Sequence, residues 1–430
     1  MTPGRAPSRL TRSSLSTLSL IAVALLLAVV AGRGELLLVS VPLALRLLGG
    51  TARRRPPAYT LEHSTSAARL LEGDRVTVFL ALTAATPIAQ VDVSETLPPE
   101  AQVVSGSPRR VLALRTGDTA RWTYELRFPE RARVSLGRVD LRFWERSGLA
   151  VSEDARSDPK PLAVYPPAVP LKRLPVPLRT QASVGNYVSP LVGDGIEPGE
   201  IRPFGPGDRV KHVNWRASLR LGQLFVTRQQ QERNADVVLM LDTLSLVGRG
   251  SATTLHASLR AATSLAAAYL ARKDRVGLIE YGGVLSWVRP GSGRPHFERL
   301  LDTLLRAEVT FTFVAKDLGV VPPRVLPPQA LVIALSPLLD ARFTAALDDL
   351  AGRGFDLIAL AVDPVPITRA ALRPTVLTDA ACRLWAVERR LQLATLAVRG
   401  IRIAAWNPDE PVEVALSRVG QRRHVRARAG

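Results

Sequence analysis

One basic segment holds most of the side chains that suggest a function. Residues Arg202–Glu232 place arginines among aromatic side chains, around the turn sequence Gly205-Pro206-Gly207-Asp208. Basic residues among aromatics can grip an anionic partner, and arginine can stack on tryptophan. We therefore take as candidate interaction residues Arg202, Phe204, Gly207, Asp208, Arg209, His212, Asn214, Trp215, Arg216, Ser218, Arg220 and Glu232.

The same segment has a purely structural interpretation. Trp215 and Phe225 would then pack this loop onto the domain that follows, while Asp208 and Glu232 would pair with nearby arginines. The sequence leaves both interpretations open. Nucleic acid is not expected as the partner, because no recognised nucleic-acid-binding module is visible.

A second place for chemistry is the end of the apolar run DVVLMLD, where Asp242 is followed by TLSL. In an α/β domain an Asp-x-Ser-x-Ser sequence here would bind a hard divalent cation through oxygen ligands. Leu244 and Leu246 stand where the two hydroxyls belong, Ser245 is one residue out of phase, and Ser336 occupies a later strand end where an Asp is expected. Asp242 and Ser245 thus mark a degenerate adhesion-site position. We predict no metal there, and expect backbone N–H groups to satisfy Asp242.

No residue pattern points to catalysis. The five histidines never pair at metal-ligand spacing, and the chain has one cysteine, Cys382, in an apolar helical context. The loop at 248–251 has glycines but lacks the lysine of a phosphate-binding P-loop. We predict a protein that is not an enzyme and has no cofactor. An enzyme with an unrecognised strand-end site around Asp242 is the less favoured alternative.

The N-terminus reads as a membrane anchor. An uncharged run, Leu15–Ala31, is long enough to cross a bilayer, and a second apolar run contains only Pro42 and Arg46 as interruptions. These runs predict transmembrane helices at about 15–31 and 35–49. Arginines flank both outer ends, so the positive-inside rule predicts a multi-pass protein of the inner (cell) membrane with its soluble body in the cytoplasm.

The alternative is a cleaved signal peptide, with Val29-Val30-Ala31 as its cleavage site. The body would then be exported, as in a protein of cell-envelope or wall assembly. The second apolar run and the triplet Arg53-Arg54-Arg55 favour the anchor.

Two soluble domains follow. Period-two alternation, clearest in RWTYELRF (121–128), predicts a small antiparallel sandwich of immunoglobulin-like type at 58–170, with a bulge at Gly137-Arg138 where the buried phase switches. After a proline-rich linker and the basic segment (171–235), short apolar strands alternate with helices from 236 to 430, which predicts a doubly wound α/β domain. Residues 1–57 form the cytoplasmic N-terminus and anchor.

The chain is basic, with a formal net charge of +19 that comes almost wholly from arginine. Such a surface attracts nucleic acid, acidic proteins or anionic lipid. An arginine-rich proteome would give the same excess without any such partner. Charge alone therefore does not choose a partner.

The basic segment resembles the family called domain of unknown function 58, whose hallmark is Arg-x-Tyr, Gly-Asp-x-x-Arg and Trp-x-x-x-Ala-Arg before a von Willebrand factor A-like domain. Phe204 replaces the Tyr, and Lys211 precedes His212 where an Arg is expected. The matching positions are Arg202, Gly207, Asp208, Asn214, Trp215, Ala217, Ser218, Arg220 and Glu232. Upstream, FWERSGL (143–149) and Val164-Tyr165-Pro166 resemble the segment that closes this family's β domain.

The resemblance implies a von Willebrand factor A-like α/β domain acting as a protein-binding module. Family members are associated with MoxR-type AAA+ ATPases, and are thought to act with them in maturing or assembling other proteins. The expected function is a membrane-anchored, non-enzymatic adaptor with a MoxR-type AAA+ ATPase as partner. Because of the departures at Leu244, Leu246 and Pro337, binding would be independent of metal.

Overall fold

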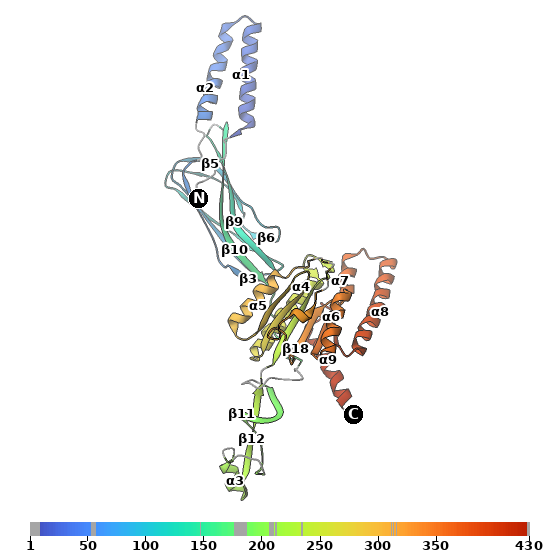
Figure 1. Ribbon diagram of the computed structural model, residues 1–430. Helices are drawn as coiled ribbons and strands as arrows, with labels where there is room; N and C mark the ends of the chain where they lie inside the picture. The colour runs from blue at the N-terminus through green and yellow to red at the C-terminus, as the bar shows by residue number, and fades with distance from the viewer. Residues whose placement is uncertain are drawn as a thin grey trace. The chain divides into compact units, whose positions relative to one another are not determined.

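The structure is a computed structural model that describes residues 9–52, 57–146, 148–175, 187–205, 210, 213–233, 235–310, 312, 314 and 316–427. The chain divides into two compact units, Met1–Tyr165 and Pro166–Gly430 (Figure 1).

Near the N-terminal end of the first unit lie two helices, α1 (Arg12–Val30) and α2 (Leu37–Ala52), joined through a 3₁₀ turn at Gly34–Leu36. Thr11 caps α1, and its hydroxyl also donates to the carbonyl of Gly148 (2.8 Å). Among the described residues α1 is the one helix whose length and apolar character would let it cross a membrane. The predicted second span coincides with α2, which has 16 residues with Pro42 among them. The multi-pass hairpin stays a prediction.

Two sheets sharing one hydrophobic core make up the rest of this unit. One sheet has the order β1-β10-β9-β5-β7, with β3 beside β10, and the other β2-β4-β8-β6. The strands are β1 (Arg9–Leu10), β2 (Tyr59–Thr65), β3 (Arg69–Leu71), β4 (Arg75–Ala84), β5 (Ile88–Glu95), β6 (Gln102–Ser105), β7 (Arg109–Leu114), β8 (Thr119–Arg127), β9 (Ala132–Trp144) and β10 (Ala150–Tyr165).

The predicted alternation is confirmed in β8, where Trp122, Tyr124 and Leu126 are buried and join the core. The apolar pattern LAVY at Leu162–Tyr165 predicts a strand over those four residues only, whereas β10 is sixteen residues long and pairs along most of β9. Polar residues fill the outward side of β10, so its sequence carries little apolar signal. Tertiary pairing extends the strand beyond what local pattern indicates.

The switch of buried phase predicted in β9 is confirmed at Gly137. Leu136 and Val139 are both buried, and Gly137 between them has φ +97°. The register shifts opposite this point, between Ser157 and Lys160, so the extra residue of the bulge lies on β10 rather than β9. The N–H of Gly137 donates to Glu95 Oε1 (2.8 Å).

Glu95 is a buried carboxylate at the centre of this domain. It is also hydrogen-bonded to His63 Nε2 (3.0 Å) and accepts from the Tyr124 hydroxyl (2.5 Å). Burial raises its pKa, but these hydrogen bonds, the charge of His63 and the Gly137 N–H outweigh burial and hold the pKa below the usual value. The network ties β2, β5, β8 and β9 together across both sheets.

The second unit contains a two-stranded ribbon, β11 (Tyr187–Pro203) with β12 (Phe225–Arg233), and helix α3 (Trp215–Leu221). The segment expected to be a loop therefore contains regular elements, α3 and parts of β11 and β12.

The main sheet of this unit has the order β17-β16-β13-β18-β19-β20. Its strands are β13 (Asp236–Thr243), β16 (Arg275–Gly282), β17 (Leu285–Gly291), β18 (Leu331–Ser336), β19 (Asp356–Val362) and β20 (Arg402–Trp406). A small hairpin, β14 (Gly248–Arg249) and β15 (Ala252–Thr253), follows β13. Every pairing in the main sheet is parallel except that of β17, an antiparallel edge strand that the sequence pattern did not predict.

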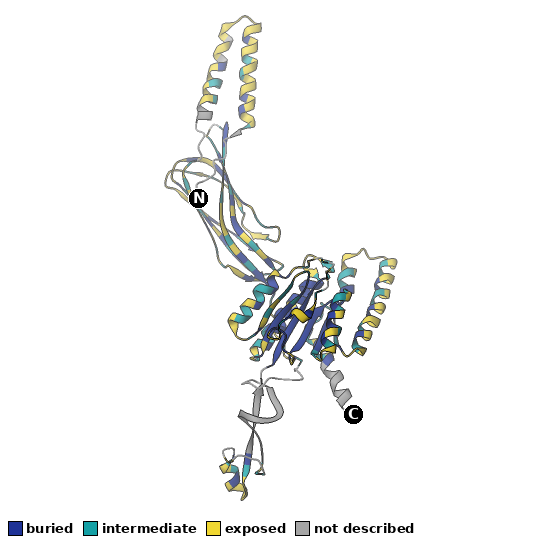
Figure 2. Ribbon diagram, in the orientation of Figure 1, coloured by how far each residue is buried: buried dark blue, intermediate teal, exposed yellow. Residues whose placement is uncertain are grey.

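Helices cover both faces of this sheet, as expected from its alternating apolar strands. One core cluster includes side chains of α4, α5 and α9, and the other includes those of α6 and α8. The helices are α4 (Thr254–Ala271), α5 (Arg294–Arg306), α6 (Ala341–Gly352), α7 (Pro364–Ala371), α8 (Val376–Val398) and α9 (Val412–Ala427). Helices α7 and α9 were not predicted from the sequence pattern. All eight residues of β13 are buried (Figure 2).

Gly137→Ala should destabilise the β domain by about 2 kcal/mol or more, since positive φ strains any other residue. A Cβ there would also lie 2.2 Å from the carbonyl oxygen of Asp158. The matched control is Gly117→Ala, because Gly117 has φ +86° but nothing within 4 Å of its Cβ. Hydrogen exchange of β9 peptides measures the difference. Equal effects of the two variants would show that crowding at Gly137 contributes nothing.

Candidate functional site

The main sheet reverses its strand order beside β13. From β13 the chain proceeds to β16 on one side, and later places β18 on the other. In open α/β sheets the carboxyl ends of two such strands form the usual place for ligands. Asp242 lies at this end of β13 and Ser336 at this end of β18.

The structure brings Asp242, Ser245 and Ser336 together, and we call them the strand-end cluster. Ser245 Oγ donates to Asp242 Oδ2 (3.1 Å), and so does Ser336 Oγ. Leu244 N donates to Asp242 Oδ1 (2.8 Å). The predicted backbone N–H donor is therefore present, but two hydroxyls contribute as well. Ser336 was noticed only as a missing acid, and its own donor role was not foreseen.

The Asp242 side chain is deeply buried, with the residue 2 % exposed. Burial raises its pKa to about 6, while hydrogen bonds from Ser336, Leu244 and Ser245 lower it and the charge of Asp340 raises it further. The effect of burial on the pKa is larger than the combined effect of the three hydrogen-bond donors. Near neutral pH the cluster therefore holds a carboxylate whose charge is costly but whose two oxygens both accept protein hydrogen bonds.

The surrounding loops close over the strand-end cluster. Leu244, where a cation site needs a hydroxyl, is buried in the core. Leu338 is held at φ +54°, its N–H donates to Ser336 Oγ (2.7 Å), and its carbonyl accepts from Gln392 of α8 (2.8 Å). Both backbone polar groups of Leu338, in the loop after β18, are thus hydrogen-bonded.

An ion pair completes this edge of the sheet. Arg342 donates to both oxygens of Asp340 (2.9 and 2.6 Å), and to the carbonyl of Thr312. The guanidinium lowers the pKa of Asp340. Within the described part of the chain no group of three or more His, Cys, Asp or Glu side chains is arranged to hold a metal ion.

The structure also divides the basic segment into a supporting and an exposed set. Asn214 Oδ1 caps α3 by accepting from Ala217 N (3.0 Å), and the buried Ser218 hydroxyl accepts from Phe225 N (2.9 Å). Val226 is buried beneath. These polar motif residues hold α3 against β12.

The remaining described motif residues of α3 face outward. Trp215 is 59 % exposed, and Arg216, Leu219 and Arg220 are exposed as well. We call these four residues the α3 face. The structural interpretation, in which Trp215 packs the segment onto the domain, is wrong for this residue, because most of its side chain is exposed to solvent. Phe225 and Phe204 are half-buried, and Arg202 donates to the carbonyl of Pro203 (3.0 Å).

Other predicted motif positions cannot be placed in this way. Gly207, Asp208, Arg209 and His212 lie outside the described residues. Glu232 is on β12, without a described side chain.

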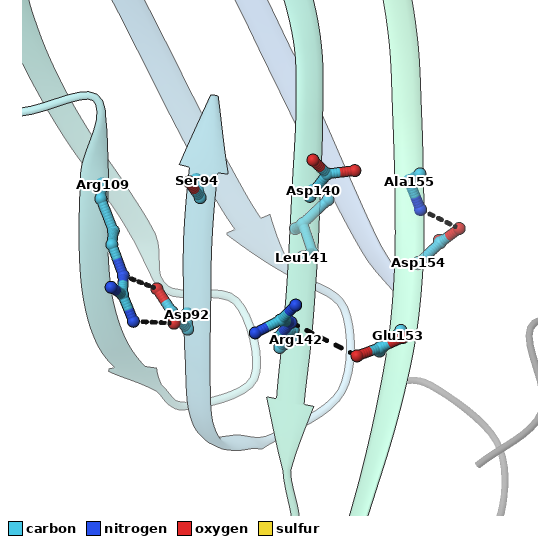
Figure 3. Close-up of a pocket in the computed structure, with 9 residues that line it drawn as sticks. All are labelled: Asp92, Ser94, Arg109, Asp140, Leu141, Arg142, Glu153, Asp154 and Ala155. Carbon is cyan, nitrogen blue, oxygen red and sulfur yellow. Dashed lines mark hydrogen bonds and ion pairs between the residues drawn. The ribbon is translucent and has the colours of Figure 1, made fainter. Parts of the chain in front are cut away.

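The first unit has a hollow of about 700 Å³ on one sheet, shown in Figure 3. Its charged walls are already paired: Arg109 donates to both oxygens of Asp92 (2.9 and 2.7 Å), and Arg142 lies 3.3 Å from Glu153. Arg109 lowers the pKa of Asp92. The lining residues are Asp92, Ser94, Arg109, Asp140, Leu141, Arg142, Glu153, Asp154 and Ala155. Such paired side chains on a sheet face suit structure better than acid–base chemistry.

Asp242→Asn should remove a pH dependence from the second unit. Because the folded pKa is raised, the folded state binds the proton more tightly than the unfolded state between about pH 4 and 6. Stability of the wild type therefore falls by about 3 kcal/mol as pH rises through that window, and then levels off. Hydrogen exchange of β13 peptides across pH 4–8 measures it.

Asp340→Asn is the matched control for this prediction. Its lowered pKa gives the opposite sign, a stabilisation present at neutral pH that is lost as pH falls through the folded pKa. An unchanged pH slope in Asp242→Asn would contradict the burial argument.

Comparisons with known proteins agree with the position of the basic segment. The curated relatives include proteins described as uncharacterized from Mycobacterium bovis (strain ATCC BAA-935 / AF2122/97) and Mycobacterium tuberculosis (strain ATCC 25618 / H37Rv), each 28% identical over 139 residues. The match covers 32% of this chain and 44% of each relative, so the chain spans less than half of their length.

Solved structures give no assignment of fold. The cupredoxin domain of amoB from Nitrosocaldus yellowstonii matches at 12% identity with a TM-score of 0.20, over 26% of this chain and 90% of that one. Native alpha-2-macroglobulin from Escherichia coli, from domain MG7 to the C-terminus, matches at 17% identity with a TM-score of 0.21, over 34% and 20%. Both scores are too low to support an argument. The family evidence is that residues 200–366, from the end of β11 into α7, match the model described as "Protein of unknown function DUF58".

Proposed function

We propose that this chain is a membrane-anchored, non-enzymatic adaptor that binds protein partners through its second unit. The observation that carries the proposal is the contrast between the strand-end cluster and the α3 face. Both oxygens of Asp242 are engaged inside the protein, whereas α3 presents a tryptophan, a leucine and two arginines to solvent. Exposed aromatic and arginine side chains are the residue types most enriched at protein interfaces.

A von Willebrand factor A-like fold for the second unit is part of this proposal. Numbered along the chain, the main sheet runs 3-2-1-4-5-6 with the third strand antiparallel, and helices lie on both faces, which supports it. An immunoglobulin-like assignment for the first unit is supported by its two sheets around one core. With Leu244 in the core and both Asp242 oxygens engaged, partner binding would not use a metal ion.

The proposed anchor is the helix pair α1 and α2. Most of α1 is apolar and exposed, which suits a lipid environment rather than water. At 16 residues α2 is short for a membrane span, and the long side chain of Arg46, inside the helix, would extend to the headgroups. The flanking arginines favour a cytoplasmic body and a multi-pass arrangement in the inner membrane.

A MoxR-type AAA+ ATPase is the partner we propose, from the resemblance of the basic segment and the match over 200–366. The α3 face would contact it, with Arg216 and Arg220 meeting acidic side chains and Trp215 at the centre of the contact. The process served would be maturation or assembly of other proteins.

Arg216→Glu combined with Arg220→Glu should abolish recovery of the partner, because two favourable charges become repulsive at once. In-cell crosslinking of the full-length chain in its native membrane, followed by identification of the attached chains, measures this. Arg324→Glu is the matched control, since Arg324 is also an exposed arginine of the second unit. An unchanged set of crosslinked proteins in the double variant would contradict the role of the α3 face.

Topology provides a separate test against the exported alternative. A reporter active only in the cytoplasm, fused after the last residue, should be active. If instead a reporter that is active only outside the cytoplasm were active at the same position, that result would overturn both the topology and the adaptor function.

A further inference from the structure

Helix α8 carries an apolar stripe that the rest of its domain does not cover. Leucine or valine recurs every seven residues at Leu377, Leu384, Leu391 and Val398, and all four are exposed. The intervening positions Ala380, Val387 and Ala394 are apolar and exposed as well. We call these seven residues the α8 seam. They follow the a and d positions of a coiled-coil heptad over the whole helix.

The opposite side of α8 attaches the helix to its own domain. Cys382, Arg389 and Leu396 also recur every seven residues, and they are the buried positions of the helix. Arg389 donates to the carbonyl of Val362 (2.8 Å), and Gln392 to that of Leu338. The seam therefore lies on the far side of a helix that is already folded and fixed (Figure 2).

Exposure of this kind is unusual for a lone chain. Leu384 is 71 % exposed, Leu391 67 % and Val398 88 %. Scattered apolar residues need no explanation, but a continuous stripe along 23 residues is typical of an interface. Because α8 is preformed, a partner helix would bind without the cost of folding it.

The charges beside the seam identify the partner. In the heptad, Arg383 and Arg390 occupy g positions and Glu388 an e position, all exposed. In a parallel pair of identical helices each g residue faces the e residue five places further along the other chain, so Arg383 meets Glu388 twice. In an antiparallel pair g faces g, and Arg383 would meet Arg390 of the other chain. We propose that α8 pairs in parallel with α8 of a second copy of this chain, forming a two-fold symmetric dimer.

Introducing charged side chains into the α8 seam tests directly whether the chain forms the proposed dimer. The full chain in detergent micelles at micromolar concentration should contain two copies by light scattering, and the variant Leu384→Glu/Leu391→Glu one copy. Both side chains are exposed in the protomer, so folding should be unaffected. Val284→Glu, at another exposed valine of the unit, is the matched control and should stay a dimer.

A charge exchange then tests the identity and direction of the partner. Arg383→Glu or Glu388→Arg alone should weaken the dimer about fivefold, because each leaves like charges facing across the seam. Together they should restore the wild-type dissociation constant within about twofold. A single-copy wild type, a dimeric seam variant, or failure of the double exchange to restore affinity would each overturn the proposal, the last by pointing to another occupant or an antiparallel contact.

Discussion

Burial of β13 on both faces is the constraint on which the second unit depends. Every residue of this strand is withdrawn from water, from Asp236 to Thr243. A carboxylate at its end cannot be hydrated, so neighbouring residues of the protein must supply its hydrogen bonds. Leu244 and Ser245 do so from the loop after β13, and Ser336 does so from the end of β18. The turn at Leu338 adopts positive φ to bring its own N–H onto Ser336. The geometry of this edge is thus organised around one acid.

The first unit also contains a buried carboxylate, and its hydrogen bonds come from a different arrangement of donors. Glu95 is also buried, but its donors come from residues distant in sequence, including His63 and Tyr124. Hydrogen bonds from His63 and Tyr124, the charge of His63 and the Gly137 N–H together outweigh the penalty of burial, so the pKa of Glu95 is lowered. At Asp242 burial is the largest effect and outweighs the hydrogen bonds, so the pKa is raised, and the charge of Asp340 adds to that rise.

The elements that were predicted correctly are those with a periodic pattern of apolar residues in the sequence. The alternation in 121–128, the phase switch at Gly137 and the apolar strands of the α/β domain all correspond to elements of the structure. Most of β10 was missed because residues 152–160 are nearly all polar, and β17 was missed because it is short and contains Pro290 and Gly291. Pairing with β9 and β16 rather than composition defines these strands.

At the candidate sites, the position of a residue in a sequence motif did not predict the role of its side chain. Asp242 was found from its position after an apolar run, whereas Ser336 could be assigned only once β18 was known to lie beside β13. In the basic segment, Asn214 and Ser218 turned out to support α3, and Trp215 to be exposed. A linear motif does not show which of its members face solvent, because that depends on the strand behind the helix.

The capping of α1 has a mechanical consequence. Thr11 and Ser14 are hydrogen-bonded to the carbonyls of Gly148 and Leu149, in the turn between β9 and β10. The first turn of the apolar helix is thereby joined to the longest pair of strands in its unit by contacts independent of chain connectivity. A force that pulls α1 along its axis would therefore act on these hydrogen bonds and on the β9–β10 pairing at the same time. Movement of the helix would be transmitted directly to the β domain and not only through the connecting chain.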